Sequence, residues 1–159
     1  MGIRLYLMQH GEAVPESENP ERPLTAQGHD DVLRTAAFLA DAKVTVARIV
    51  HSGKLRAADT AAMMAQAIGA DAAIDVRPKG LLPGDSPVPL AEDVLDWRED
   101  TLVVGHQPFM GRLASRLLQG KEQPPAFEFT PGTIACLARR PVTGAWFLVW
   151  LLPPGLLPR

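Results

Sequence analysis

The chain has 159 residues, 47% of them hydrophobic, which is enough for one domain with a buried core and too few for two. A net charge of −2 gives no basic field of the kind that attracts nucleic acid or an anionic membrane. Cys136 is the only cysteine, so no disulfide can form within the chain, and a reducing compartment is the simpler expectation. No secretory leader is recognisable, and the apolar run at residues 145–152 is too short to cross a membrane. We therefore expect a cytoplasmic protein.

The first half of the chain alternates short strand-like and longer helix-like segments. Residues 3–8 are almost continuously apolar, which predicts a strand buried on both faces. Thr25 is a suitable N-cap for a helix that reaches about residue 40, and residues 48–51 form a second short strand. Ser52 is another residue of the capping type, ahead of a helix that ends at Gly69. The predicted buried stripes are Val32, Leu33, Ala36, Ala37 and Ala40 in the first helix, and Leu55, Ala58, Ala61, Ala62, Ala65 and Ile68 in the second.

The second half continues the alternation. Residues 73–76 are a weaker strand candidate, and the Pro- and Gly-rich residues 78–89 are expected to be irregular. Residues 90–97 and 109–118 read as helices on either side of a core strand at 101–104. Residues 133–137 and 146–152 read as two final strands, joined through a hairpin turn at 141–144. The pattern predicts a single α/β domain over residues 1–152, in which helices flank a mainly parallel central sheet, followed by a surface tail at 153–159.

Histidines and arginines follow the predicted strands. His10 and Gly11 come directly after the first strand, Arg56 comes shortly after the second, and His106 after the strand at 101–104. Arg22 lies just ahead of the first helix. Because the carboxyl ends of parallel strands lie along one edge of a sheet, these side chains are expected to gather there. Two imidazoles and two guanidinium groups in one place indicate a phosphate-binding pocket.

Four motifs in order make the chain resemble the histidine phosphatase superfamily, and within it the small phosphohistidine phosphatases of the SixA type. They are Gln9-His10-Gly11, Arg22-Pro23-Leu24-Thr25, Ser52 with Arg56-Ala57 and Asp59-Thr60, and Val104-Gly105-His106 with Pro108. The resemblance implies a phosphoglycerate mutase-like, three-layer sandwich. The family's first motif opens with Arg-His-Gly, and Gln9 stands in the place of that arginine. This change removes a positive charge that normally touches the phosphoryl group.

The resemblance also implies a role for each residue of the pocket. His10 is expected to attack phosphorus and to become transiently phosphorylated, while Arg56 and His106 stabilise the transferring group. Gln9, Gly11, Arg22 and Ser52 are expected to bind phosphate. Two of these have plain structural alternatives, since Arg22 could instead pair with a nearby glutamate and Ser52 could cap the helix. No carboxylate cluster surrounds the motifs, so we expect neither a metal nor another cofactor.

The general acid is less evident. Family members that cleave phosphate esters use an acidic residue after the third strand, where this chain offers only Asp85, which could equally be a turn residue. Cleavage of phosphohistidine depends less on a general acid, because its imidazole ring, once protonated on the free nitrogen, leaves as a neutral molecule. We therefore predict a phosphatase acting on a phosphohistidine-containing phosphorelay protein, without nucleic acid or membrane partners. The alternatives are a hydrolase of small phosphate esters, and a phospho-ligand binding module whose catalysis is weakened by Gln9.

Overall fold

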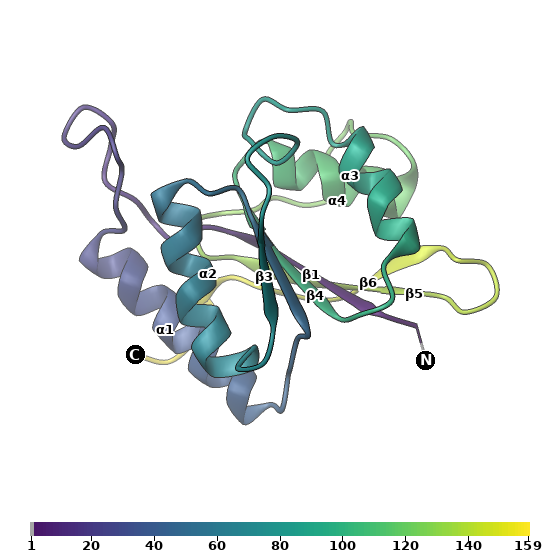
Figure 1. The fold of residues 1–159 in the computed structure, drawn as a ribbon, viewed down its shortest axis with the longest axis horizontal. Helices are drawn as coiled ribbons and strands as arrows, with labels where there is room; N and C mark the ends of the chain where they lie inside the picture. The colour runs from purple at the N-terminus through teal and green to yellow at the C-terminus, as the bar shows by residue number, and fades with distance from the viewer. Residues whose placement is uncertain (1) are drawn as a thin grey trace.

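A six-stranded mixed sheet runs through the computed structural model, which describes residues 2–159 (Figure 1). The strands are β1 (Arg4–Gln9), β2 (Arg48–His51), β3 (Ala73–Val76), β4 (Thr101–Gly105), β5 (Ile134–Arg139) and β6 (Trp146–Leu152). They lie in the order β3-β2-β4-β1-β5-β6. The first four strands in this order are parallel to one another. β5 pairs with β1 in the antiparallel direction, and β6 pairs with β5 in the antiparallel direction. The expected mainly parallel sheet is confirmed.

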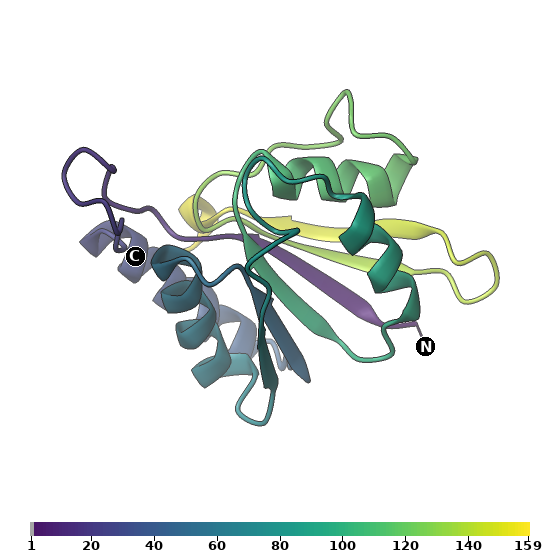
Figure 2. The same ribbon diagram turned by 45° about the horizontal axis from the view of Figure 1, so that its top comes forward.

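Helices cover both faces of this sheet, as Figure 2 shows. One face carries α1 (Ala26–Asp41) and α2 (Leu55–Ile68), and the other carries α3 (Val88–Asp93), the short 3-10 helix η1 (Val94–Asp96) and α4 (Phe109–Gln119). The three-layer α/β architecture predicted from the sequence is therefore confirmed. No helix in residues 2–159 combines the length and the apolar character needed to cross a bilayer.

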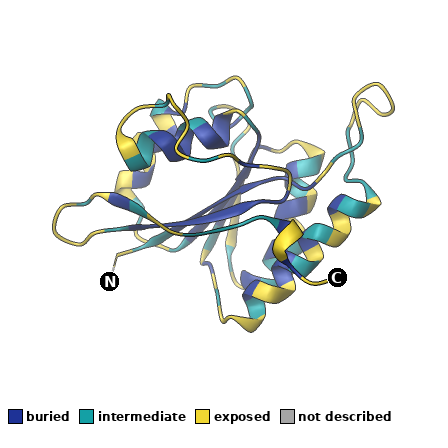
Figure 3. Ribbon diagram, turned by 180° about the vertical axis from the view of Figure 1, so that it is seen from behind, coloured by how far each residue is buried: buried dark blue, intermediate teal, exposed yellow. Residues whose placement is uncertain are grey.

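Successive side chains of β1 enter different layers. Leu5 and Leu7 pack into the core beneath α3 and α4, whereas Tyr6 and Met8 pack beneath α1 and α2. Side chains of a strand point alternately to opposite faces, so a strand covered on both sides must be apolar throughout. This explains the unbroken apolar run in the sequence, and Figure 3 shows the central strands as the most buried part of the molecule.

The two helices on the first face bury different stripes from those predicted. In α1, Leu33 and Ala37 are exposed, and the buried residues are Gly28, Val32, Thr35, Ala36 and Leu39. In α2, Leu55 and Ala62 are exposed, and the buried residues are Ala57, Thr60, Ala61, Met64 and Ile68. Both predictions counted apolar residues only, whereas α1 turns Gly28 toward the backbone of Glu12 and α2 turns Thr60 inward, where its hydroxyl is hydrogen-bonded.

Three further elements differ from expectation. The helix predicted at 90–97 begins earlier, at Val88, and its second half is the 3-10 helix η1. The residue that caps α2 is Lys54, without a side-chain bond, whereas the predicted cap Thr25 of α1 does accept a hydrogen bond from Gly28 N. The tail contains a 3-10 helix, η2 (Pro154–Leu156), and the guanidinium group of Arg34 in α1 donates to the carbonyl of Leu157 at 3.2 Å. The tail is thus docked on α1.

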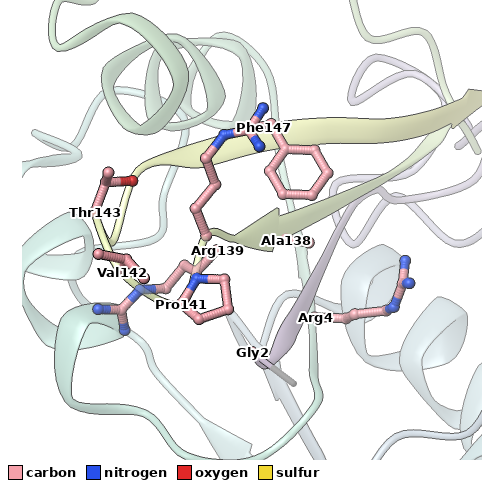
Figure 4. A pocket seen from close by; sticks show the side chains of 9 residues that line it. Gly2, Arg4, Ala138, Arg139, Pro141, Val142, Thr143 and Phe147 are labelled. Carbon is pink, nitrogen blue, oxygen red and sulfur yellow. The ribbon is translucent and has the colours of Figure 1, made fainter.

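Two hollows lie at opposite ends of β1. A cleft of about 420 Å³ lies beside the start of the strand, where Arg4, Ala138 and Phe147 line it together with the turn between β5 and β6 (Figure 4). A second hollow, of about 550 Å³, lies between the loop that precedes α1 and the beginning of α2. The motif histidine His10 follows the far end of β1, so the cleft of Figure 4 is not where the motifs meet.

Candidate active site

His10 follows the last residue of β1 and is held by its backbone and its ring. Its N–H donates to the carbonyl of Gly105 at 3.0 Å, and its carbonyl accepts from Gly132 N at 3.0 Å. The ring atom Nδ1 lies 2.7 Å from the carbonyl oxygen of Gly11. A carbonyl can only accept, so Nδ1 carries the hydrogen and Nε2 presents its lone pair. This is the orientation that a nucleophilic imidazole requires.

The environment of His10 keeps its ring neutral. The residue is only 6% exposed, and this burial lowers the pKa of His10 from 6.5 to about 4. The hydrogen bond to Gly11 opposes the shift, while the charges of Arg56 and Arg22 add to it. Near pH 7 the imidazole is therefore uncharged and its lone pair is free to attack.

His106 lies beside His10 because β4 is the parallel neighbour of β1. Gln9 is in register with Gly105, so the residues that follow them meet at the same edge of the sheet. The two imidazole centroids are 5.2 Å apart. Burial, followed by the charges of His10 and Arg56, lowers the pKa of His106 to about 3.

Ser52 contacts the ring of His106. Its Oγ lies 2.6 Å from Nε2, and the N–H of Lys54 donates to the same oxygen at 3.3 Å. Because this oxygen accepts from Lys54, its own hydrogen is free to donate to Nε2. In that tautomer the ring hydrogen of His106 sits on Nδ1, a buried atom without a hydrogen-bond partner in residues 2–159. Such an unpartnered buried donor is costly unless a ligand oxygen meets it. Ser52 thus positions His106, a role that neither sequence interpretation of Ser52 had assigned.

Thr60 connects the first motif to the second helix. Its hydroxyl accepts from Gly11 N at 3.1 Å and donates to the carbonyl of Arg56 at 2.7 Å. The turn after His10 is therefore tied to the turn of α2 that carries Arg56. Sequence reasoning included Thr60 in a motif but gave it no role, because a threonine inside a helix carries no signal of a contact 49 residues away.

The two arginines of the motifs reach the same place. Both Arg22 and Arg56 line the 550 Å³ hollow, and their charges act on both histidines. The Nε atom of Arg56 is buried without a partner, and burial lowers the pKa of that guanidinium group. Arg22 has a left-handed backbone (φ 51°), and its Nε donates to the carbonyl of Val14 at 3.1 Å. No ion pair joins Arg22 to a glutamate in residues 2–159, so both guanidinium groups retain donors for an anion.

Gln9, the departure from the family motif, is 8% exposed. Its backbone N–H donates to the carbonyl of Thr133, and its side-chain Oε1 is buried without a hydrogen-bond partner in the described chain. The amide therefore stands at the site as a neutral group with an unused acceptor, in the position where family members carry a cation.

The candidate acid lies in a turn. The carboxylate of Asp85 accepts from Gly80 N at 2.8 Å and from Leu82 N at 3.0 Å, and these hydrogen bonds lower its pKa. The structure thus gives this carboxylate the turn role, and it shows no contact from Asp85 to either motif histidine in residues 2–159. The small-ester alternative could also use Glu12, beside the first motif, as its acid, but the Oε1 of Glu12 accepts from the hydroxyl of Thr25 at 2.8 Å. Residues 2–159 contain no group of three or more His, Cys, Asp and Glu side chains placed to hold a metal ion.

The assembled site holds a neutral nucleophilic imidazole, a second imidazole and two guanidinium groups, which together can bind a tetrahedral anion and displace a group from its central atom. The family model of the histidine phosphatase superfamily (branch 1) matches residues 5–79. The phosphohistidine phosphatase SixA of Escherichia coli (strain K12) is 30% identical over 131 residues, which cover 79% of this chain and 80% of that protein.

Solved structures agree with this assignment. The structure of the protein histidine phosphatase SixA complexed with tungstate is 25% identical, has a TM-score of 0.83, and covers 96% of this chain and 98% of its own. A phosphoglycerate mutase from Plasmodium falciparum, 22% identical with a TM-score of 0.68, shares the fold over 94% of this chain and 90% of its own. The chain belongs to the histidine phosphatase superfamily.

Proposed function

We propose that this phosphatase removes the phosphoryl group from phosphohistidine on a phosphotransfer protein, through a transient phosphoryl group on His10. The observation that carries the proposal is the state of the two imidazoles. His10 is held neutral with its Nε2 lone pair unused, and His106 beside it has a buried ring atom without a partner. A phosphoryl group placed between them would accept from His106 while its phosphorus faces Nε2 of His10.

Binding of a tetrahedral oxyanion at this place is supported from two sides. The buried Nε of Arg56 is a donor without a protein partner. The structurally similar SixA forms a complex with tungstate, which is a tetrahedral oxyanion like phosphate. We expect Arg56 and Arg22 to hold the equatorial oxygens, with Gly11 and Ser52 fixing the two histidines rather than binding phosphate themselves.

The reaction then proceeds in two displacements. Nε2 of His10 forms a bond to phosphorus as the P–N bond of the substrate breaks, and the departing imidazole takes the electron pair. Protonated beforehand on its other nitrogen, this imidazole leaves as a neutral molecule. Water then attacks the phosphoryl group on His10, and the bond between phosphorus and Nε2 breaks. The electron pair of that bond returns to Nε2, which leaves His10 neutral. The hydroxyl of the water stays on phosphorus, and its second proton passes to a phosphate oxygen. Neither step requires a metal ion or an external acid.

The turn role of Asp85 favours this leaving group over an alcohol. An alkoxide leaves poorly unless an acid protonates it, and the carboxylate of Asp85 is occupied by two backbone N–H groups. The fold itself does not decide between leaving groups, since a mycobacterial glucosyl-3-phosphoglycerate phosphatase, 18% identical, shares it with a TM-score of 0.68.

The test is a comparison of three substrates. Phosphate release is measured from a phosphohistidine-containing phosphotransfer protein, an aryl phosphate and an alkyl phosphate, with His10→Ala as the control. We expect the first two to be cleaved and the alkyl phosphate to be left largely intact. Efficient cleavage of the alkyl phosphate would instead support a small-ester hydrolase, and vanadate binding without any turnover would support a binding module.

A further inference from the structure

We propose that Glu16 makes the site selective for substrates whose leaving group carries a positive charge, as protonated phosphohistidine does. The proposal rests on the proposed function, because it assigns a selectivity to the same site. It concerns the half of the substrate that the phosphate-binding residues do not touch, namely the imidazole ring that departs.

The hollow next to the phosphate site is lined by charges of both signs. Glu16 and Glu21 come from the loop between β1 and α1, which Figure 1 shows extending away from the rest of the molecule. Three cations line the same hollow: Arg22 from that loop, Lys54 at the N-cap of α2, and Arg56 in its first turn. Since Arg22 and Arg56 are the proposed phosphate ligands, the hollow opens from the place where the phosphoryl group would bind.

These opposite charges share a hollow without touching. None of the ion pairs within residues 2–159 involves Glu16, Glu21, Arg22, Lys54 or Arg56, although other surface carboxylates and guanidinium groups do pair. Glu16 is nonetheless near enough to act on Arg56, since its charge raises the pKa of that guanidinium group. These acidic and basic groups therefore line the same hollow of about 550 Å³ without being paired, and the hollow has room for a ligand.

A ligand that satisfies both sides must be negative at one end and positive at the other. Arg22 and Arg56 in the lining favour an anion on their side of the hollow, and the buried Nε of Arg56 has no partner in the described chain. The carboxylates of Glu16 and Glu21 in the same lining favour a cation beside that anion. Phosphohistidine protonated on its free ring nitrogen has this pattern, a phosphoryl group joined directly to an imidazolium ring, whereas an aryl phosphate carries no positive charge.

The charge of Glu16 would also assist the chemistry. Only the protonated form releases neutral imidazole, so a carboxylate that raises the pKa of the bound substrate increases the reactive fraction. If the substrate imidazole has a pKa of about 6.5 and Glu16 raises it by about one unit, the protonated fraction at pH 8 rises from about 3% to about 24%, roughly eightfold. At pH 5.5 the same shift changes the protonated fraction by only about 10%.

The groups that face Glu16 set the background for this pH dependence. Glu21 adds to the negative wall, whereas Arg22, Lys54 and Arg56 oppose it. His10 and His106 titrate near 4 and 3, outside the range of interest, and so they remain neutral between pH 5.5 and 8. If the ratio of kcat/KM for the phosphohistidine peptide to kcat/KM for the aryl phosphate changes over this pH range, the change therefore comes from the substrates and from Glu16.

The experiment compares Glu16→Gln with Glu18→Gln, a matched control in the same loop whose carboxylate does not line the hollow. kcat/KM is measured for a phosphohistidine peptide and for an aryl phosphate at pH 8 and pH 5.5. We expect Glu16→Gln to lose roughly three- to tenfold toward the phosphohistidine peptide at pH 8 and little at pH 5.5. Toward the aryl phosphate, which carries no positive charge, Glu16→Gln should lose nothing or gain slightly, because a negative charge near the site is removed. Glu18→Gln should match the wild type.

The outcomes separate this inference from the proposed function. Equal losses on both substrates at both pH values would show that Glu16 only supports Arg56, and no loss on either would show that it has no role; each result overturns the inference and leaves the proposed function standing. A wild-type protein that cleaves the aryl phosphate but not the phosphohistidine peptide would instead overturn the proposed function.

Discussion

Lowering the pH from 7 to 5 should leave the imidazole of His10 almost entirely neutral. Burial lowers the pKa of His10 to about 4. At pH 5 such a histidine is about 90% neutral, whereas one with an unperturbed pKa of about 6.5 is about 3% neutral, a difference of roughly 30-fold in reactive imidazole. The folded protein also binds fewer protons at His10 than the unfolded chain does between pH 6.5 and 4. The unfolding free energy should therefore fall as the pH is lowered through this window.

The direct assay is an NMR titration of the imidazole rings, with the signal of His10 assigned by its loss in His10→Gln. The measurement does not involve substrate, whose own phosphoryl group titrates near pH 6 and would complicate a rate profile. We expect a midpoint close to 4 for His10. A midpoint close to 6.5 would refute the reasoning that burial and the two arginines hold His10 neutral.

Three further predictions follow from particular contacts. In Gly28→Ala, the added methyl group would clash with the backbone carbonyl of Glu12 and lie within 2.8 Å of the Glu12 nitrogen. The turn after His10 would have to shift, which should lower the unfolding free energy by about 1–3 kcal/mol and also lower kcat. A wild-type unfolding free energy in a denaturant titration together with a wild-type kcat would contradict this prediction. Asp85→Asn should keep the kcat/KM of the wild type for an aryl phosphate, because the carboxylate holds a turn; a large loss would return Asp85 to the role of acid. Gln9→Arg should tighten vanadate binding, since a charged hydrogen bond contributes about 1.5–3 kcal/mol; unchanged or weaker binding in a folded variant would show that Arg22 and Arg56 leave no place for a third cation.

The elements that carry the catalytic motifs were predictable from sequence because each has a local signal. The alternating apolar and amphipathic runs place β1, β2 and β4, and the motif residues follow their ends within a few positions. Thr25 was predicted as a cap for the same reason, since an N-cap needs only its own side chain and the next three residues.

Contacts between distant segments were not predictable in the same way. Gly28 faces inward because the backbone of Glu12 packs closely against it, and Thr60 is buried where its hydroxyl accepts a hydrogen bond from Gly11 N. Ser52 was interpreted as a cap or a phosphate ligand, and the structure shows that it contacts His106, which is 54 residues away. In each case a polar or small residue is buried for a partner that its neighbours in sequence do not reveal.

The central claim is that His10 becomes phosphorylated during turnover. The most direct measurement is rapid quenching of the protein with a phosphohistidine protein labelled in its phosphoryl group, at alkaline pH, followed by peptide mapping by mass spectrometry. We predict one acid-labile phosphoryl group on the peptide that contains His10, formed and lost at rates compatible with turnover and absent in His10→Ala. Turnover at the wild-type rate in His10→Ala, or a wild-type protein that releases phosphate with no label on His10 at any time, would contradict the account.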